Sequence, residues 1–242
     1  MWTSENSPCR HLGEYRRESP AFEETRIVSL VAALPVGFAC RKRRLEFGSD
    51  AKRREWIGVG RIVVSSMVAL DGVMGAPERW AFPFADEDFN RWVLHELLAS
   101  DALLLGRTTY EGFADYWPSA EDGSGLADRM NAMPKFVVST TLEGPLAWNA
   151  TLIEGDLVEA VSDLKRRPGG DVLVLASADL VHELARQELV DEYRLRLAPV
   201  LAGGGKRLLG EVGEPKALRL VGTETFASGV VVLTYRPAEQ DG

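Results

Sequence analysis

Three short segments of the chain combine small, hydroxyl and basic residues directly after apolar runs. They are Gly106-Arg107-Thr108-Thr109, Ser139-Thr140-Thr141 and Ala176-Ser177-Ala178-Asp179. Open α/β sheets bind ligands at the carboxyl ends of their strands, and free N–H groups at a helix N-terminus bind anions. Arg107 adds a planar guanidinium that suits a phosphate. For any one segment, simple helix capping by Ser or Thr explains the residues equally well. The three together predict a site for a dinucleotide or another polyphosphate.

A fourth segment, Leu70-Asp71-Gly72-Val73-Met74-Gly75, follows the apolar run 61–69. Asp71 stands just beyond this run, beside glycines, where a carboxylate can hold or protonate a substrate. The alternative is that Asp71 only builds an Asp-Gly turn, which is a common turn pair. The loop continues through Trp80 to Phe84 and is a candidate lid over a substrate. We therefore predict a catalytic role for Asp71 and substrate contacts at Asp71, Gly75 and Trp80.

Other motifs are excluded. Gly203-Gly204-Gly205-Lys206 is followed by Arg207 rather than Ser or Thr, so it is not a phosphate loop of the Walker type. No Gly-x-Gly-x-x-Gly fingerprint opens the first βα turn, and no Gly-x-Ser-x-Gly elbow occurs. The two cysteines and three histidines are scattered, so we expect no metal site. His95 and His182 are expected to be ordinary surface or half-buried residues.

The elements that position these segments follow from hydrophobic periodicity. Strands are expected at 61–69, 102–105, 136–138, 172–175 and 192–198, helices at 86–100, after 106, at 157–167 and at 179–188, and an antiparallel hairpin at 218–225 and 230–235. Strands that alternate with helices favour an α/β sandwich with a mainly parallel central sheet, here completed by a C-terminal antiparallel hairpin.

Composition sets the class and the domain limits. The chain has 242 residues, of which 45% are apolar and 26% charged, as in ordinary globular proteins. Its net charge of −8 gives no general attraction for nucleic acid or anionic membranes. Residues 1–58 carry 11 basic and 8 acidic residues, whereas residues 59–242 carry 17 and 28. We expect residues 1–58 to be a poorly ordered extension outside the catalytic domain, which spans 59–238.

The apolar run 27–40 does not indicate a membrane or secretory segment. It has 14 residues, whereas a membrane span needs roughly 20. Its strongest basic cluster, Arg41-Lys42-Arg43-Arg44, follows the run, whereas a secretory signal places positive charge before it. The expected location is therefore the cytoplasm.

Four stretches resemble the dihydrofolate reductase superfamily, in the branch that shares the riboflavin-biosynthesis reductase domain (the RibD C-terminal domain). The stretches are Val68–Gly75, Asp101–Glu111, Phe136–Ser139 and Leu189–Gly205. The resemblance implies a dihydrofolate-reductase-like three-layer sandwich. It also implies an NADPH-dependent reductase that transfers a hydride to a pyrimidine- or pterin-derived substrate, similar to 5-amino-6-(5-phosphoribosylamino)uracil reductase. Many members pair through their sheets, so a homodimer is expected.

The resemblance also assigns residues to the cofactor. In the family, a Gly-Arg-x-Thr turn holds the cofactor phosphates. This turn corresponds to Gly106, Arg107 and Thr109 in the present chain, with Thr108 at the variable position. Ser139 and Thr140 correspond to the contact with the adenosine ribose phosphate. A glycine-rich turn that cradles the pyrophosphate corresponds to residues 176–179, where this chain has Ala176, Ser177, Ala178 and Asp179 and no glycine. An alanine methyl there hinders close approach of the backbone to the phosphates.

Two alternatives to a reductase remain open at this stage. The glycine-free turn is compatible with a non-catalytic nucleotide-binding protein on the same fold. A partner-binding module would instead use Tyr116 and Trp117 as exposed aromatic residues. Dihydrofolate reductases place a single acid on the first helix, near Asp86, Glu87 and Asp88 in this chain. The riboflavin-pathway zinc deaminase signatures are absent from residues 1–58.

Overall fold

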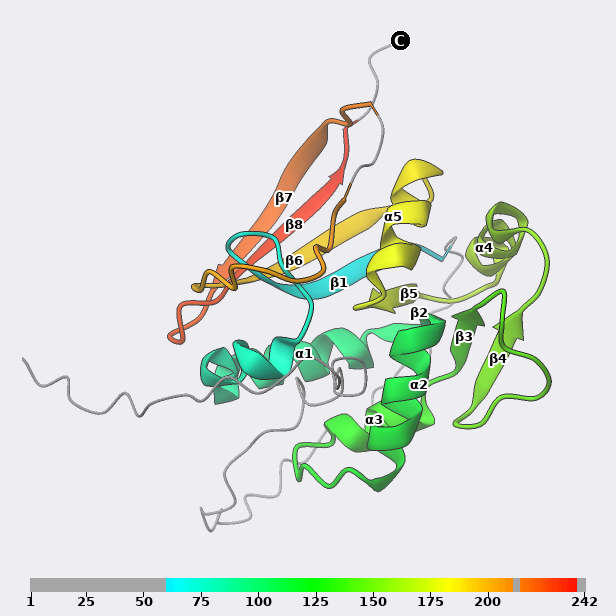
Figure 1. The fold of residues 1–242 in the computed structure, drawn as a ribbon, viewed down its shortest axis with the longest axis horizontal. Helices are drawn as coiled ribbons and strands as arrows, with labels where there is room; N and C mark the ends of the chain where they lie inside the picture. Colours follow the sequence, from blue (N-terminus) through cyan, green and yellow to red (C-terminus); the bar gives the residue numbers. More distant parts are fainter. Residues whose placement is uncertain (1–59, 211–213, 239–242) are drawn as a thin grey trace, which may run out of the picture.

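The computed structural model describes residues 60–210 and 214–238, so the extension at 1–58 lies outside the described residues. Eight strands form one sheet in the order β4-β3-β2-β5-β1-β6-β8-β7 (Figure 1). The strands are β1 (Ile62–Ala69), β2 (Ser100–Gly106), β3 (Lys135–Val138), β4 (Ala150–Ile153), β5 (Asp171–Leu175), β6 (Glu192–Ala198), β7 (Leu218–Thr225) and β8 (Val231–Pro237).

The sheet is parallel from β4 to β6 and antiparallel at its C-terminal end. β1 pairs in parallel with both β5 and β6, and β2 pairs in parallel with β3 and β5. β8 runs antiparallel to β6, and β7 antiparallel to β8. The carboxyl ends of the parallel strands therefore meet at one edge of the sheet, as expected.

Helices cover both faces of the sheet (Figure 1). They are α1 (Glu87–Leu98), α2 (Arg107–Tyr116) and α3 (Leu126–Ala132) on one face, and α4 (Leu157–Arg166) and α5 (Ala178–Arg186) on the other. Val63 and Met67 of β1 pack in the α1 layer, whereas Val64 and Val68 pack in the α4–α5 layer. Every residue of β1 is buried, because a central parallel strand is covered on both sides. The expected three-layer α/β sandwich is confirmed.

Some details differ from the sequence-based expectations. Strand β4, helix α3 and the short 3-10 turns η1 (Pro77–Arg79), η2 (Phe82–Phe84) and η3 (Trp117–Ser119) were not expected, because segments of three to seven residues carry little periodicity. Trp117 is completely buried and packs edge-on against Phe113 and Tyr116. The exposed aromatic surface that a partner-binding module would need at Trp117 is therefore absent. No helix in the described part of the chain is long and apolar enough to cross a membrane.

Candidate functional site

Two hydroxyl groups join the turns that follow β2 and β5. The Gly106 amide donates to Ser177 Oγ at 3.0 Å, and the Ser177 amide donates to Thr109 Oγ1 at 3.2 Å. Ser177 and Thr109 are both buried. The structure thus brings two of the three predicted segments together and uses these hydroxyls to hold them, with Arg107 at the start of α2 beside the junction.

The turn after β5 has the backbone of a glycine turn without glycine. Ala176 has φ +50° and Ser177 has φ +55°, both in the left-handed region that disfavours a Cβ atom. The two hydrogen bonds of Ser177 help to hold it there. Ala176 has no polar side chain that could hold it in this conformation. Its left-handed backbone is therefore strained at the predicted site.

Helices α2 and α5 begin at this edge without a side-chain cap. The N-cap residues are Gly106 for α2 and Ser177 for α5, and neither accepts a side-chain hydrogen bond from the first-turn amides of its helix. In contrast, Asp86 and Asp156 cap α1 and α4, and Asp122 accepts a hydrogen bond from the first turn of α3. The uncapped amides of α2 and α5, with their positive helix dipoles, suit a ligand that carries phosphate groups.

Arg107 and Thr108 are exposed at the start of α2. Arg107 pairs with Glu111 at 3.1 Å, with both side chains about half exposed. Such an exposed pair contributes little stability, so the guanidinium is available to a phosphate. Asp179, on α5, points into solvent and pairs with Lys206 at 2.6 Å, which offsets its repulsion of an anion.

The segment after β3 forms its own turn. Ser139 Oγ accepts hydrogen bonds from the amides of Thr141 at 3.1 Å and Leu142 at 3.0 Å. Ser139 Oγ also lies 3.4 Å from Thr141 Oγ1, so its hydroxyl hydrogen can be donated either to Thr141 or to a ligand. Thr140 is exposed beside it.

Asp71 fastens the glycine-rich loop 203–205 to the end of β1. Its Oδ2 accepts a hydrogen bond from the Gly203 amide at 2.8 Å, and its carbonyl accepts one from Arg207. The bond from Gly203 lowers the pKa of Asp71. Its Oδ1 is buried and makes no hydrogen bond to a described residue. Asp71 is therefore an ionised acceptor with one free oxygen, better suited to orienting a ligand N–H than to donating a proton.

The loop after Asp71 is fixed by backbone contacts. The Gly75 amide donates to the Lys206 carbonyl at 3.0 Å, and a Cβ atom at Gly75 would lie 2.9 Å from the Lys206 nitrogen. Trp80 is buried in the core, and its Nε1 donates to the Gly75 carbonyl at 3.0 Å. Glycine is thus needed at 75 for packing against residue 206, and Trp80 anchors the loop. Substrate contacts at these two residues stay predictions.

The acids around the start of α1 already have partners. Asp86 accepts hydrogen bonds from Phe89 at 2.8 Å and from Ser228, in the β7–β8 turn, at 2.9 Å. The amide of Phe89 is the main cause that lowers the pKa of Asp86. Glu87 and Asp88 are exposed and pair with Arg91. These three acids therefore serve the helix and the hairpin turn.

Sequence reasoning missed a buried ion-pair network at the opposite edge of the sheet. Arg194 pairs with Glu96, Asp171 and Glu192 at 2.6 to 3.2 Å, and Arg61 pairs with the last two at 2.7 and 3.0 Å. Burial raises the pKa of Glu192, but the surrounding arginines lower it by more, so its net shift is downward. The signal was present in β6, where charged residues recur at every second position from 192 to 196.

The fold and the uncapped carboxyl edge define a dihydrofolate-reductase-like α/β protein. Within that class the chain belongs to the family of the RibD C-terminal domain, whose family model matches residues 61–232. It is 32% identical over 181 residues to the uncharacterized protein YyaP of Bacillus subtilis (strain 168), covering 72% of this chain and 94% of YyaP. It is 24% identical to YwjB of the same organism, covering 70% and 94%.

Solved structures of low sequence identity share the fold. A putative riboflavin biosynthesis protein from Shewanella sp. PV-4 superposes with a TM-score of 0.59 at 20% identity, covering 74% of this chain and 99% of that one. Dihydrofolate reductase from Enterococcus faecalis, complexed with NADP(H), superposes with a TM-score of 0.52 at 13% identity, covering 75% and 99%. The resemblance drawn from the sequence is confirmed.

Proposed function

We propose that this member of the RibD C-terminal domain family is an NADPH-dependent reductase of a pyrimidine- or pterin-derived substrate. The observation that supports this most is the pair of helices without a side-chain cap, α2 and α5, at the carboxyl edge of the sheet. Arg107, the first residue of α2, is exposed there. The family membership and the NADP(H) complex of the Enterococcus enzyme support the same cofactor.

The residues at this edge fit a dinucleotide. The amides of the first turns of α2 and α5 would bind the pyrophosphate, and Arg107 with Thr108 would bind phosphate oxygens. Ser139 and Thr140 would contact the ribose phosphate. The left-handed turn at Ala176 and Ser177 retains the backbone of a glycine turn, so the cost to cofactor binding is confined to side-chain atoms. When bound, NADPH supplies the hydride.

The protein's own part in the reaction lies with the loop after β1. Asp71, held by Gly203, keeps an ionised oxygen free to orient an N–H group of the substrate. The loop around Trp80 packs into the core and would shield the reacting carbon from water. Positioning and exclusion of water are the contributions expected of a protein whose cofactor performs the redox chemistry.

Cofactor affinity tests the assignment. NADPH carries a ribose phosphate that NADH lacks, and Arg107 would contact it beside Ser139, because the ends of β2 and β3 are neighbours. One such charge-assisted contact contributes on the order of 1.5–3 kcal/mol, so NADPH should bind about tenfold or more tightly than NADH. Arg107→Ala should remove most of this preference. Arg91→Ala is the matched control, since Arg91 is likewise exposed and paired within its helix. Isothermal titration showing equal affinity for NADPH and NADH in the unaltered protein would refute the assignment.

A further inference from the structure

One arginine of β6 is buried without a carboxylate partner. Arg196 is 7% exposed, and its Nη2 donates a hydrogen bond to the Ser65 carbonyl at 3.3 Å. Its Nε has no partner among the described residues. Buried charges are normally paired, because the transfer of an unpaired charge from water into the protein costs several kcal/mol.

The neighbouring charges do not remove this imbalance. On this face of the sheet, the buried network and its edge contain four guanidinium groups, of Arg61, Arg194, Arg196 and Arg236, and three carboxylates, of Glu96, Asp171 and Glu192.

The carboxylate that Arg196 faces is Glu96 on α1. The oxygens of Glu96 already accept hydrogen bonds from Ser65 Oγ at 2.8 Å and Arg194 at 3.2 Å. A surface cleft beside the network is lined by Arg219 and Glu224 as well. Their charges have opposite signs, so together they leave the charge balance unchanged. Each of the three carboxylates therefore already pairs with another arginine, and none of them is in hydrogen-bond contact with Arg196.

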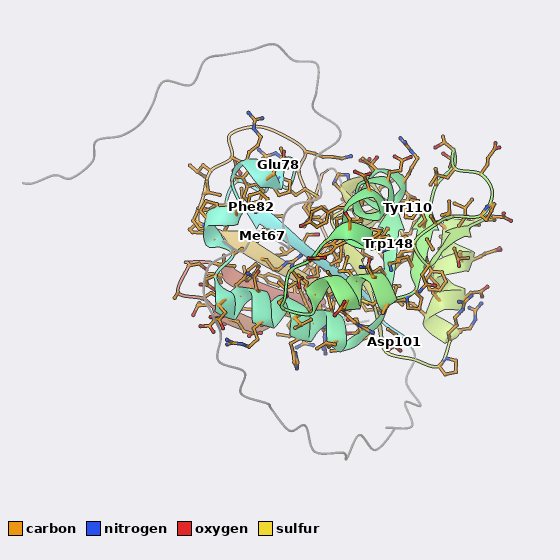
Figure 2. All side chains as sticks on the ribbon, turned by 90° about the horizontal axis from the view of Figure 1, so that it is seen from below. Met67, Glu78, Phe82, Asp101, Tyr110 and Trp148 are labelled. Carbon is orange, nitrogen blue, oxygen red and sulfur yellow. The ribbon has the colours of Figure 1, made fainter. Side chains whose placement is uncertain are left out.

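Arg196 lies on the side of the network that faces the loop after β1. It is paired in register with Met67, two residues before the end of β1. By strand alternation its side chain shares the face of Arg194, beneath α1. Figure 2 shows Met67 grouped with Glu78 and Phe82 of the loop, away from Tyr110 and Trp148.

Several unpaired polar atoms lie on segments that adjoin the carboxyl ends of β1 and β6. In the described part of the chain, seven buried side-chain polar atoms lack a partner, and four of them lie on segments at the carboxyl ends of β1 and β6. They are Asp71 Oδ1, Glu78 Oε2, Arg196 Nε and Ser228 Oγ. Asp71 and Glu78 offer acceptors, whereas Arg196 offers a buried positively charged donor. A polar ring that carries both N–H donors and an oxygen acceptor would offer a partner to each kind of atom.

We propose that Arg196 is the specificity-determining residue of the substrate site, and that it selects a ring bearing an oxo or carboxylate oxygen over a ring that bears amino groups and no such oxygen. This rests on the proposed reductase function. The substrate oxygen would accept a hydrogen bond from the Arg196 guanidinium, whose Nε has no acceptor among the described residues. A 2,4-diaminopyrimidine would place donors, and on protonation a positive charge, against the guanidinium.

The test compares two pyrimidines and three variants of the full chain. The probes are 5,6-diaminouracil, which has two ring oxo groups, and 2,4-diaminopyrimidine, which has none. Binding of each is measured by titration calorimetry with NADPH present. The unaltered protein should bind the oxo ring and not the diamino ring. Arg196→Met should weaken binding of the oxo ring by about tenfold or more, and Arg196→Lys should retain part of it.

Stability separates specificity from a structural role. Arg196→Met should melt at the same temperature as the unaltered protein or higher, because it removes a poorly paired buried charge. Arg194→Met, two residues away on the same face, should lower the melting temperature because it leaves Glu96 and Glu192 buried without their shared partner. An equally large fall for Arg196→Met would overturn the proposal.

The binding outcomes are also decisive. The proposal fails if NADPH binds but the unaltered protein binds the diamino ring as well as the oxo ring, binds neither, or binds the oxo ring equally in Arg196→Met. If NADPH does not bind while the oxo ring binds in an Arg196-dependent way, the reductase function fails and the assignment of Arg196 stands.

Discussion

Lys135 should make the stability of the fold rise with pH. It opens β3 and is 1% exposed. Its ammonium group donates to the Asn131 carbonyl at 3.1 Å and lies 4.0 Å from the centre of the Trp148 ring. Burial, with a smaller contribution from the positive charge of Arg129, lowers the pKa of Lys135 from 10.5 to about 8.

The sign and size of the effect follow from proton linkage. Between pH 8 and 10.5 the unfolded chain keeps a proton that Lys135 has released in the folded protein, so the free energy of unfolding increases with pH. Each pKa unit corresponds to about 1.4 kcal/mol, which gives a gain of roughly 2.5 kcal/mol between pH 7 and pH 10.

The assay is urea unfolding from pH 7 to pH 10 for the unaltered protein and Lys135→Met. Methionine keeps an unbranched chain of similar length but cannot titrate, so the gain should vanish. Measurement stops at pH 10 because a second group titrates above it. Burial raises the pKa of Tyr193 to about 12, so above pH 10 this tyrosine loses its proton in the unfolded chain before it does so in the folded protein. The free energy of unfolding then falls as the pH rises.

Lys206→Met, which changes an exposed lysine, should retain the pH dependence of the unaltered protein. Identical pH profiles for the unaltered protein and Lys135→Met would refute the reasoning about burial at Lys135.

Four further outcomes are expected. Ala176→Gly removes the methyl group from a left-handed residue, so it should raise NADPH affinity and stabilise the fold by up to about 1 kcal/mol; weaker NADPH binding would count against the site. Asp71→Asn keeps an oxygen for the Gly203 amide, so melting should change little while single-turnover NADPH oxidation slows about 10- to 100-fold; normal turnover removes Asp71 from the reaction. Residues 59–242 alone should fold and bind NADPH like the full chain, and an insoluble product would contradict this. Light scattering should give twice the chain mass of 26.6 kDa, because Leu218 and Leu220 are exposed on the edge strand β7; a single-chain mass would contradict a homodimer.

Local sequence signals predicted the main elements because those signals are physically strong. The run Glu192–Ala198 was expected as a strand with the limits that the structure gives it. The expected helix at 157–167 is observed at Leu157–Arg166, where Asp156 caps its start. Hydrophobic periodicity and caps act within a few residues, so a single sequence contains them.

The site depended on contacts that a sequence does not contain. The hydroxyls of Ser177 and Thr109 join the turns after β5 and β2 by hydrogen bonds. These bonds require β2 and β5 to be neighbours in the sheet, which local sequence patterns do not specify. Likewise, Arg194 and Arg196 look equivalent in the sequence, yet one is surrounded by carboxylates and the other has none in hydrogen-bond contact. Their difference arises because α1, β5 and β6 place Glu96, Asp171 and Glu192 around Arg194.

Isotope transfer is the most direct test of hydride chemistry. The protein is incubated with NADPH deuterated at carbon 4 of the nicotinamide, separately on each face, and with a panel of oxopyrimidines and pterins. Mass spectrometry then follows the reduced products. The proposed function predicts a reduced product that carries one deuterium from one face of the cofactor. Tight binding of NADPH without oxidation by any member of the panel would contradict it and favour a non-catalytic nucleotide-binding protein.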